Sequence, residues 1–578
     1  MLKTLYKSIR EFKKPSILTI VIVSMEVVLE CIIPFIVAGL ITKIESGCDL
    51  DTIINYGGIL VVMALLSLIC GATAGKFCAT ASCGFARNLR KDMFDKIQTY
   101  SFENIDKFQS SSLVTRLTTD VTNVQHSYMM LIRTAIRSPF MLVFSFVMGF
   151  LMGGRIAVIY LAVIPILFTG LILIARRAMP LFRKVFKKYD NLNNSIQENV
   201  KGMRVVKAFV REDYEIEKFG KAATDVCNDF TKAERILAWN SPIMNFCLHS
   251  IMIFILSFGS YTVISSSGLK INIGQMSALL TYGFQILMSL MMISMIYVMI
   301  TMSIESAERI VEVLKEEVVL ESKENAEMVV ADGSIKFENV SFKYGTSKMI
   351  LDNINLEIAS GETIGIIGST GSAKSTLIQL ISRLYDVTEG TVYVGGKDVR
   401  DYDLDALRDQ VSVVLQKNIL FSGTIKENLR WGKNDATDEE MIHVCKLAQA
   451  DSFIQSFPNG YDTYIEQGGA NVSGGQRQRL CIARALLKSP KIIIFDDSTS
   501  AVDTKTDALI RKGMREYIPE TTKIIIAQRT ASVADADKII VMDKGRIAAI
   551  GNHKELMQTC DIYKEVYESQ NKAGDDNE

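Results

Sequence analysis

Residues 362–385 read ETIGIIGSTGSAKSTLIQLISRLY, and this stretch decides the fold of the second half of the chain. A short apolar run leads directly into a loop of small residues, and a helical pattern follows the loop. This order is typical of a phosphate-binding loop, because the backbone N–H groups turn inward and the helix N-terminus adds a positive dipole. The expected ATP-binding residues of the loop are Gly368, Ser369, Thr370, Gly371, Ser372, Ala373, Lys374, Ser375 and Thr376.

Three positions in this loop carry specific expectations. Lys374 is expected to contact the β- and γ-phosphates of ATP, and the Ser375 hydroxyl to bind Mg²⁺. Ala373 stands where the usual pattern has glycine, and its Cβ crowds the backbone next to the phosphates. We therefore expect weakened or slowed ATP binding rather than its loss. The alternative, a loop that binds nothing, is disfavoured by the strand and helix on either side.

Short apolar runs alternate with amphipathic stretches from Ile335 onward, which predicts a mainly parallel sheet with crossover helices, an α/β domain. The expected strands are IKFENVSFKY (335–344), ETIGIIG (362–368), VSVVL (411–415), KIIIFDD (491–497), TKIIIAQ (522–528) and KIIVMD (538–543). The run KIIIFDD ends in two carboxylates. Asp496 is expected to hold Mg²⁺ through water, and Asp497 to act as the general base that faces the attacking water.

The first half of the chain concentrates the apolar residues. The 578-residue chain is 48% hydrophobic and 22% charged, which suits a protein that lies partly in lipid and partly in water. Six runs reach the length of about 20 residues that crosses a bilayer. They lie at 16–41, 56–82, 134–153, 156–176, 242–265 and 275–303. We therefore expect an all-α six-helix transmembrane domain ahead of the α/β domain.

The distribution of basic residues orients these six spans. Lysines and arginines cluster before the first span, after the second and after the fourth, whereas the alternate loops hold few. By the positive-inside rule, both termini and the ATP-binding domain are expected in the cytoplasm, with the spans in the cell membrane. The segments 83–128 and 177–235 are long, charged and helically periodic, so the membrane helices are expected to continue into the cytoplasm.

Composition also sets the domain boundaries and argues against two other classes of protein. The expected parts are a transmembrane domain at 1–315, a linker at 316–333, an ATP-binding domain at 334–566 and a disordered tail at 567–578. Lys+Arg and Asp+Glu balance at 64 each, so no nucleic-acid partner is expected. The 10 cysteines form no CxxC pair and only 4 histidines are present, which argues against a zinc site.

Residues 471–479 read NVSGGQRQR, and this string resembles the signature of the ATP-binding cassette (ABC) family. Physically, Ser473, Gly474, Gly475 and Gln476 at the start of a helix form a second phosphate-binding surface. One cassette needs only one such surface for its own nucleotide. The second is therefore expected to serve ATP held by a partner, so that two cassettes enclose two nucleotides head to tail.

Other positions are assigned by this resemblance alone. Tyr344 matches the aromatic residue that stacks on adenine. Gln416 matches the loop glutamine that contacts Mg²⁺ and the attacking water while reporting to the membrane domain. The segment Ser500–Asp503 looks like the loop that crosses between cassettes, and Glu466 resembles an acidic loop typical of exporters.

The resemblance extends to the membrane half. Segments 111–125 and 199–213 resemble the cytoplasmic coupling helices of bacterial multidrug exporters. It implies a half-transporter that uses ATP and Mg²⁺, exports small hydrophobic or amphipathic compounds by alternating access, and works beside a second half-transporter. Three alternatives stay open: a homodimer, an exporter of lipid or peptide, and an ATP-binding regulator that does not pump.

The cassette departs from the family pattern in the site for its own nucleotide. Asp497 stands where active cassettes carry glutamate, and it is shorter by one methylene. Gln528 stands where they carry a switch histidine, and glutamine supplies no positive charge. With Ala373 these make three departures, whereas the signature is intact. The combination resembles the degenerate-site subunit of bacterial heterodimeric exporters, and a homodimer that tolerates aspartate as base is the alternative.

Two acids interrupt the first apolar run. Glu26 and Glu30 lie one helical turn apart, and a charge at mid-bilayer costs about 3 kcal/mol. Such residues therefore face the interior of a helix bundle or water. One interpretation is attraction for cationic substrates, and the favoured one is a hydrogen-bonded contact between helices.

Overall fold

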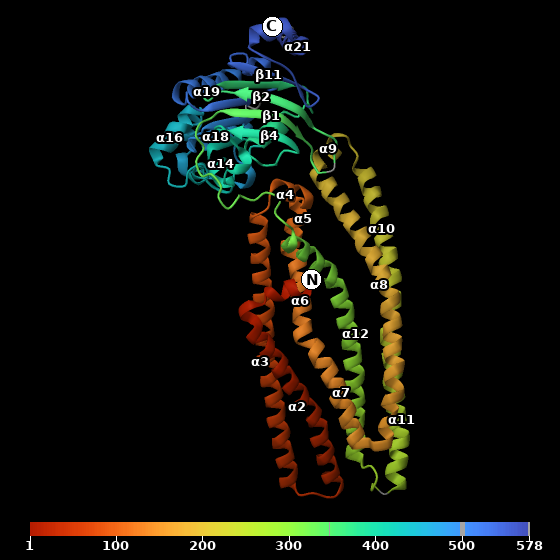
Figure 1. Ribbon diagram of the computed structural model, residues 1–578. Helices are drawn as coiled ribbons and strands as arrows, with labels where there is room; N and C mark the ends of the chain where they lie inside the picture. The colour runs from red at the N-terminus through yellow and green to blue at the C-terminus, as the bar shows by residue number, and fades with distance from the viewer. Residues whose placement is uncertain (267, 346, 498–502, 576–578) are drawn as a thin grey trace. The chain divides into compact units, whose positions relative to one another are not determined.

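The computed structural model describes residues 1–266, 268–345, 347–497 and 503–575. The chain forms two compact units (Figure 1). The helical unit comprises Met1–Thr99 and Phe108–Glu317, and the α/β unit comprises Tyr100–Lys107 and Val318–Glu578. Apart from the short segment Tyr100–Lys107, this division falls within two residues of the boundary at 315 that the sequence predicts.

Six long helices dominate the helical unit, and each contains one expected span almost completely. They are α2 (Lys13–Glu45), α3 (Leu50–Gln98), α7 (Thr134–Gly153), α8 (Val158–Lys201), α11 (Asn240–Ser265) and α12 (Ile273–Lys315). In the described part of the chain, five continuous helical runs are long and apolar enough to cross a membrane. One of them, Ser110–Phe182, contains α7 and the first part of α8, joined by a short 3₁₀ turn at Gly154–Ala157.

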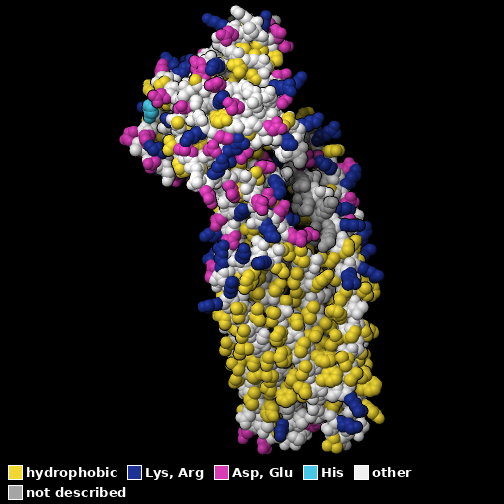
Figure 2. Space-filling view, viewed as in Figure 1, with side chains coloured by type: hydrophobic (Ala, Val, Ile, Leu, Met, Phe, Trp, Pro, Cys, Tyr) yellow, Lys and Arg dark blue, Asp and Glu magenta, His cyan; other side chains and the backbone are white. Residues whose placement is uncertain are grey.

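The side chains on the visible face of these helices form a broad apolar belt with charged residues beyond both of its edges (Figure 2). An apolar belt bounded by charge is the surface that a lipid bilayer requires. The chain is therefore a multi-pass membrane protein.

The long helices continue beyond the belt, as the sequence predicts. The shorter elements of this unit are α1 (Leu2–Lys7), a 3₁₀ turn (Arg10–Phe12), α5 (Ser110–Thr115), a π-helix (Arg116–Asp120), α6 (Val121–Ile132), α9 (Met203–Ala208) and α10 (Glu212–Leu237). The helix α4 (Phe102–Phe108) belongs to the α/β unit except for its last residue.

Small residues and buried tyrosine hydroxyls hold the membrane helices together. Gly274 at the start of α12 lies so close to α2 that an added Cβ would stand 2.1 Å from the Ala38 carbonyl oxygen. The Tyr282 hydroxyl donates a 2.8 Å hydrogen bond to the Cys31 carbonyl, and the Tyr160 hydroxyl donates one of 2.5 Å to the Leu279 carbonyl. These bonds satisfy polar groups in surroundings without water.

Two sheets form the core of the α/β unit. The six-stranded sheet has the order β12-β11-β3-β10-β9-β6, and its strands are parallel except for β12. Its strands are β3 (Thr363–Gly368), β6 (Val411–Val414), β9 (Ile492–Asp496), β10 (Thr522–Ile526), β11 (Lys538–Asp543) and β12 (Arg546–Gly551). Five of the six predicted strands are in this sheet.

The sixth predicted strand, at 335–344, belongs elsewhere. It is β1 (Ile335–Phe342), and it pairs antiparallel with β2 (Leu351–Ile358) and β4 (Glu389–Val394). This four-stranded sheet ends with β5 (Lys397–Asp398), and a two-stranded pair joins β7 (Gly423–Thr424) to β8 (Tyr464–Ile465). Alternating burial along β2 is typical of an antiparallel strand, but the sequence does not state which partner a strand selects.

Helices cover the sheets, and the last of them corrects an expectation. They are α13 (Lys374–Ile381), α14 (Leu404–Gln410), α15 (Ile425–Arg430), α16 (Asp438–Leu447), α17 (Asp451–Ser456), α18 (Gly474–Leu487), α19 (Thr504–Tyr517), α20 (His553–Thr559) and α21 (Asp561–Asp575). The tail from 567 was expected to be disordered, but α21 continues to Asp575. The buried Tyr563 anchors this helix, so its polar composition does not prevent folding.

Candidate functional site

The phosphate-binding loop joins β3 to α13, as the sequence predicts. The strand is fixed by buried isoleucines, with Ile364, Ile366 and Ile367 each at most 2% exposed. The Lys374 ammonium group donates hydrogen bonds of 2.8 Å to the carbonyls of Gly368 and Ser369 and so lies across the loop. Burial lowers the pKa of Lys374, and the nearby Asp496 and Asp497 oppose that shift.

Ala373 has the left-handed backbone conformation, with φ at +72°, at the N-cap of α13. For an L-residue other than glycine, this conformation costs about 1–2 kcal/mol. The expectation from sequence concerned crowding by the Cβ. The structure gives a second reason why glycine suits this position, which is the backbone conformation itself.

The two expected Mg²⁺ ligands Ser375 and Asp496 lie side by side. The Ser375 hydroxyl donates a 3.0 Å hydrogen bond to Asp496 Oδ1. Burial raises the pKa of Asp496, the Ser375 hydrogen bond lowers it, and the neighbouring Asp497 raises it further. A hydroxyl and a carboxylate at the end of a strand are the hard oxygen ligands that Mg²⁺ prefers, so these residues fit the ion.

Asp497, Gln528 and Gln416 form one cluster at the carboxyl ends of the parallel strands. In the register of β9 with β10, Asp496 stands beside Ile526, so residues that follow both strands meet at one edge. Asp497 Oδ2 accepts a 2.7 Å hydrogen bond from Gln528 Nε2 and a longer one of 3.4 Å from Gln416 Nε2. The carboxylate expected to act as base is therefore engaged by two neutral amides.

Gln570 of α21 hydrogen-bonds to the segment that carries Gln528. The sequence did not predict this role for Gln570. Its side-chain oxygen accepts hydrogen bonds of 2.9 Å from both the backbone N–H and the hydroxyl of Thr530. Its side-chain nitrogen donates a 2.7 Å bond to the Gln528 carbonyl. The spacing Tyr563, Val566, Tyr567, Gln570 is that of one helical face, and this signal could have identified the helix.

Tyr344 packs against α13, the helix that follows the loop 368–376. Its hydroxyl donates a 2.9 Å hydrogen bond to Gln379 Oε1 of α13 and lies 3.2 Å from the Thr376 hydroxyl. Its ring meets those of Phe342 and Tyr385 edge to face, with centroids 4.8 and 5.1 Å apart. The residue expected to contact adenine thus lies next to the phosphate-binding helix.

Tyr385 continues this aromatic group to the segment Tyr100–Lys107. Its hydroxyl donates a 2.6 Å hydrogen bond to Asp106, and its ring lies 6.2 Å from that of Phe102. Burial and the Asp106 carboxylate raise the pKa of Tyr385 well above its ordinary value. The segment Tyr100–Lys107 belongs to the α/β unit, whereas the expected coupling segment 111–125 belongs to the helical unit.

The signature residues form the N-terminus of α18. The Ser473 hydroxyl accepts a 3.2 Å hydrogen bond from the Gln476 N–H, and the Gln476 side chain accepts one of 2.9 Å from the Ser473 N–H. This reciprocal capping box fixes the first turn. Ser473 and Gly474 are exposed, Gly475 is half-buried, and a Cβ added at Gly474 would meet no atom within 4 Å.

Two further expected segments have different outcomes. Glu466 is held by its backbone N–H, which donates to the Asn471 side chain beside the signature. Of the segment 500–503, Ser500, Ala501 and Val502 lie outside the described residues, and Asp503 caps α19 by accepting from the Thr506 N–H at 2.9 Å. Among the described residues no hydrogen bond joins Ser473–Gln476 to the loop 368–376, so the chain does not bring its two phosphate surfaces together.

Glu26 and Glu30 share one arginine. Arg137 of α7 donates a 2.9 Å hydrogen bond to Glu26 and two bonds of 2.7 Å to Glu30. The interpretation as a hydrogen-bonded contact between helices is confirmed. Arg137 was missed, although it lies inside an expected span, where an arginine requires a partner.

Comparison with known proteins gives the same architecture. A family model described as "ABC transporter transmembrane region" matches residues 16–291, and one described as "ABC transporter" matches residues 351–500. The uncharacterized ABC transporter ATP-binding protein YfiB of Bacillus subtilis (strain 168) is 35% identical over 557 residues, which is 96% of each chain. The ATP-dependent lipid A-core flippase of Desulfotalea psychrophila (strain LSv54 / DSM 12343) is 33% identical over 84% of each.

A solved structure supports the fold. The structure of a bacterial Atm1-family ABC exporter with ATP bound superposes with a TM-score of 0.82, covering 97% of this chain and 98% of that one. Its sequence is 24% identical.

Proposed function

Because the chain belongs to the ABC transporter family, as a half-transporter of the exporter type, we propose that it exports small hydrophobic or amphipathic compounds in complex with a second, different half-transporter. In this complex its own ATP site binds nucleotide and hydrolyses it slowly. Its signature completes the partner's site, where most ATP is turned over. Both termini and the α/β unit lie in the cytoplasm, which the basic residues at the span ends support.

The observation that carries this proposal is the state of Asp497. A general base must direct an oxygen at the attacking water, and hydrogen bonds from neighbouring donors fix the orientation of that carboxylate. Here Gln528 and Gln416 both donate to one oxygen of Asp497. The carboxylate is also one methylene shorter than glutamate, and misplacement by about 1 Å can cost a hundredfold in rate.

The residues of this chain otherwise suit nucleotide binding. Lys374 already bonds to main-chain oxygens of the loop and can exchange them for phosphate oxygens. Ser375 and Asp496 would hold Mg²⁺, which neutralises phosphate charge when it is bound. The site can therefore hold ATP and help close the two cassettes even where hydrolysis is slow.

The alternating-access cycle follows from two shared sites. ATP binding draws two cassettes together, and segments such as α4, whose Phe102 and Asp106 contact Tyr385, transmit the movement to the membrane helices. Hydrolysis and product release then reset the resting state. A regulator that does not pump would not require an intact signature and a hydrogen-bonded α4.

The test compares the chain alone with the chain combined with a second half-transporter from the same genome. Both preparations are reconstituted in lipid nanodiscs, and Mg²⁺-dependent ATP hydrolysis is measured. We expect slow hydrolysis from the chain alone and rapid hydrolysis from the pair. Rapid hydrolysis by the chain alone, abolished by Asp497→Asn, would establish the homodimer instead.

A second cargo class is favoured by one specific relative. The flippase of Desulfotalea psychrophila acts, by its name, on a lipid, and it aligns with most of this chain. Transport of a fluorescent phospholipid and of a fluorescent organic cation, measured in the same vesicles with the partner present, distinguishes the two classes. Movement of the phospholipid alone would assign the chain to lipid export.

A further inference from the structure

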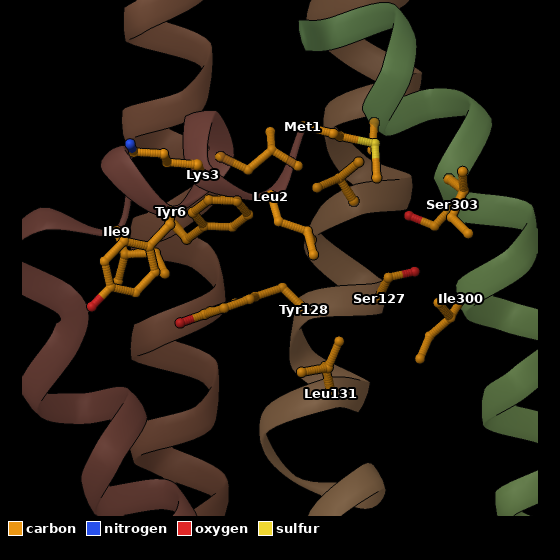
Figure 3. A pocket seen from close by; sticks show the side chains of 15 residues that line it. Met1, Leu2, Lys3, Tyr6, Ile9, Ser127, Tyr128, Leu131, Ile300 and Ser303 are labelled. Atoms are coloured by element: carbon orange, nitrogen blue, oxygen red, sulfur yellow. The ribbon is translucent and has the colours of Figure 1, made fainter.

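A cavity of about 500 Å³ opens in the helical unit beneath the N-terminal segment (Figure 3). Four parts of the chain line it, namely Met1–Ile9, Phe85 of α3, the α6 residues between Val124 and Leu131, and the α12 residues between Ile300 and Ala307. Its volume falls within the range of about 300–1,000 Å³ that is common for small-molecule sites.

The lining is almost entirely apolar. Leu2, Leu131 and Ile304 line it and remain 76%, 47% and 37% exposed, so apolar surface faces the opening. Figure 3 shows Ser127 and Leu131 of α6 and Ile300 of α12 facing one common space. The Tyr128 hydroxyl lies 2.7 Å from the Ser16 hydroxyl, so this polar group already has a partner and leaves its ring to the cavity.

The depth of the cavity in the membrane follows from its lining. Met1–Ile9 precede the first expected span, Phe85 follows the second, Val124–Leu131 precede the third, and Ile300–Ala307 border the end of the sixth. All four segments therefore mark the same membrane interface, at the level where lipid headgroups meet acyl chains.

The N-terminal segment supplies positive charge at this interface. Lys3, Lys7 and Lys14 are exposed, and among the described residues none of them has a carboxylate within ion-pair distance. By contrast, Arg10 is paired with Asp92. In Figure 3 the nitrogen of Lys3 points away from the apolar cluster, as expected for a lysine whose stem packs on apolar surface while its ammonium group reaches the headgroup level.

We propose that this cavity binds an acyl chain of an anionic membrane lipid from the leaflet on the side of the N-terminus, with the headgroup held by Lys3 and Lys7. An apolar cavity that is lined by Lys3, with Lys7 one helical turn further along α1, matches an amphiphile with a negative head. A zwitterionic lipid offers the same acyl chain but no net charge for the lysines. This inference concerns a lipid site on the chain and does not depend on which cargo is exported.

The experiment uses the complete transporter in nanodiscs that contain a trace of photoactivatable lipid. One sample carries phosphatidylglycerol with a diazirine near the end of an acyl chain, and the other carries phosphatidylcholine with the same chain. After illumination, mass spectrometry locates the labelled peptides. We expect phosphatidylglycerol to label α6 and α12 around Leu131 and Ile304, and phosphatidylcholine to label them several-fold less.

Two variants and their matched controls separate the cavity from general lipid contact. Ser127→Trp fills the cavity and should abolish labelling of α6 and α12, whereas His126→Trp, on the exposed neighbouring position, should not. Neutralising Lys3 and Lys7 with glutamine should reduce the preference for phosphatidylglycerol by about fivefold for each lysine. Lys43→Gln, at the other end of α2, should leave that preference unchanged.

Several outcomes would overturn the proposal. Equal labelling by both lipids would show that the lysines do not select the headgroup. Labelling that Ser127→Trp leaves unchanged would show that the acyl chain does not lie in the cavity. If Ser127→Trp fails to fold, the lysine variants decide the question alone. Chemical crosslinking of an Ile304→Cys variant to the second half-transporter would show that protein, and not lipid, covers the opening.

Discussion

The α/β unit carries two surfaces that are expected to act on nucleotide, the signature and the Asp497 cluster, and their side chains differ in the hydrogen bonds that they make. At the N-terminus of α18, Ser473 and Gln476 hydrogen-bond to each other, and a Cβ added at Gly474 would meet no atom within 4 Å among the described residues. At the ends of β9 and β10, Asp497 is engaged by Gln528 and Gln416. The signature is ordered and accessible, whereas the Asp497 carboxylate accepts hydrogen bonds from two side-chain amides of the same chain.

In the proposed complex, this difference would allow one cassette to hydrolyse its own ATP slowly and still complete the partner's site. The two surfaces lie on separate elements, and the capping box that orders the signature uses none of the residues that depart from the family pattern. Substitutions near Asp497 therefore leave the signature intact. The experiments below test whether the two surfaces also act separately.

The largest effect is expected at the signature. Gly474→Glu puts a carboxylate at the helix N-terminus that faces the partner's triphosphate, so ATP hydrolysis by the two-subunit complex should fall by about 10²–10³-fold. Gly474→Ala is the matched control, because it adds no charge and its Cβ meets no atom of this chain within 4 Å. Comparable hydrolysis rates for Gly474→Glu and the unmodified complex would contradict the assignment of this surface to the partner's nucleotide.

The next effect is a gain at the other surface. The double variant Asp497→Glu, Gln528→His restores the longer base and the switch histidine, and hydrolysis at this chain's own site should rise by about a hundredfold. The rate is measured in a complex whose partner site has been inactivated. Asp497→Asn in the unmodified complex should barely alter the total rate, and a large loss there would show that this site already carries the turnover.

A smaller effect is expected at Gln570, whose side chain holds the segment from Gln528 to Thr530. Gln570→Ala removes the acceptor of the Thr530 N–H, so hydrogen exchange at that amide should accelerate by about fivefold, equivalent to one net hydrogen bond of about 1 kcal/mol. Exchange measured by mass spectrometry on the complete transporter gives this rate. Ser569→Ala, one residue earlier on α21, is the control and should leave the exchange rate as it was.

The smallest effect is expected in the loop between β3 and α13. Ala373→Gly relieves a left-handed conformation at a cost of backbone entropy, so the transporter should gain about 0.5–1 kcal/mol in unfolding free energy and bind ATP somewhat more tightly. Thermal unfolding and nucleotide titration measure both changes. Ala406→Gly, inside α14, should destabilise the unit instead, and a loss of similar size at Ala373 would contradict the role of its backbone conformation.

Much of the fold could be predicted because its signals are local. Apolar runs of bilayer length predicted the six long helices of the helical unit. The apolar run before the small residues that begin at Gly368 predicted the strand and the loop that follows it. Asp497 and Gln528 were assigned to one nucleotide site by their match to family positions, and in the structure they meet because parallel strands end at one edge of a sheet.

The features that were missed depend on contacts between distant parts of the chain. Arg137 meets Glu26 across 111 residues, and Asp106 meets Tyr385 across 279. Neither pair has a local pattern, because only the packing of helices brings its members together. The same holds for β1, whose antiparallel partners are decided by the sheet and not by its own sequence.

The bonds of Gln570 have a consequence for the order in which the protein is made. The ribosome adds Gln528 to the growing chain 42 residues before Gln570. Until α21 has been synthesised and has folded, the Thr530 N–H lacks its acceptor, although every ATP motif is already present. A nascent or prematurely terminated chain can thus carry the complete set of ATP motifs and still lack the hydrogen bonds from Gln570 that hold Gln528 and Thr530.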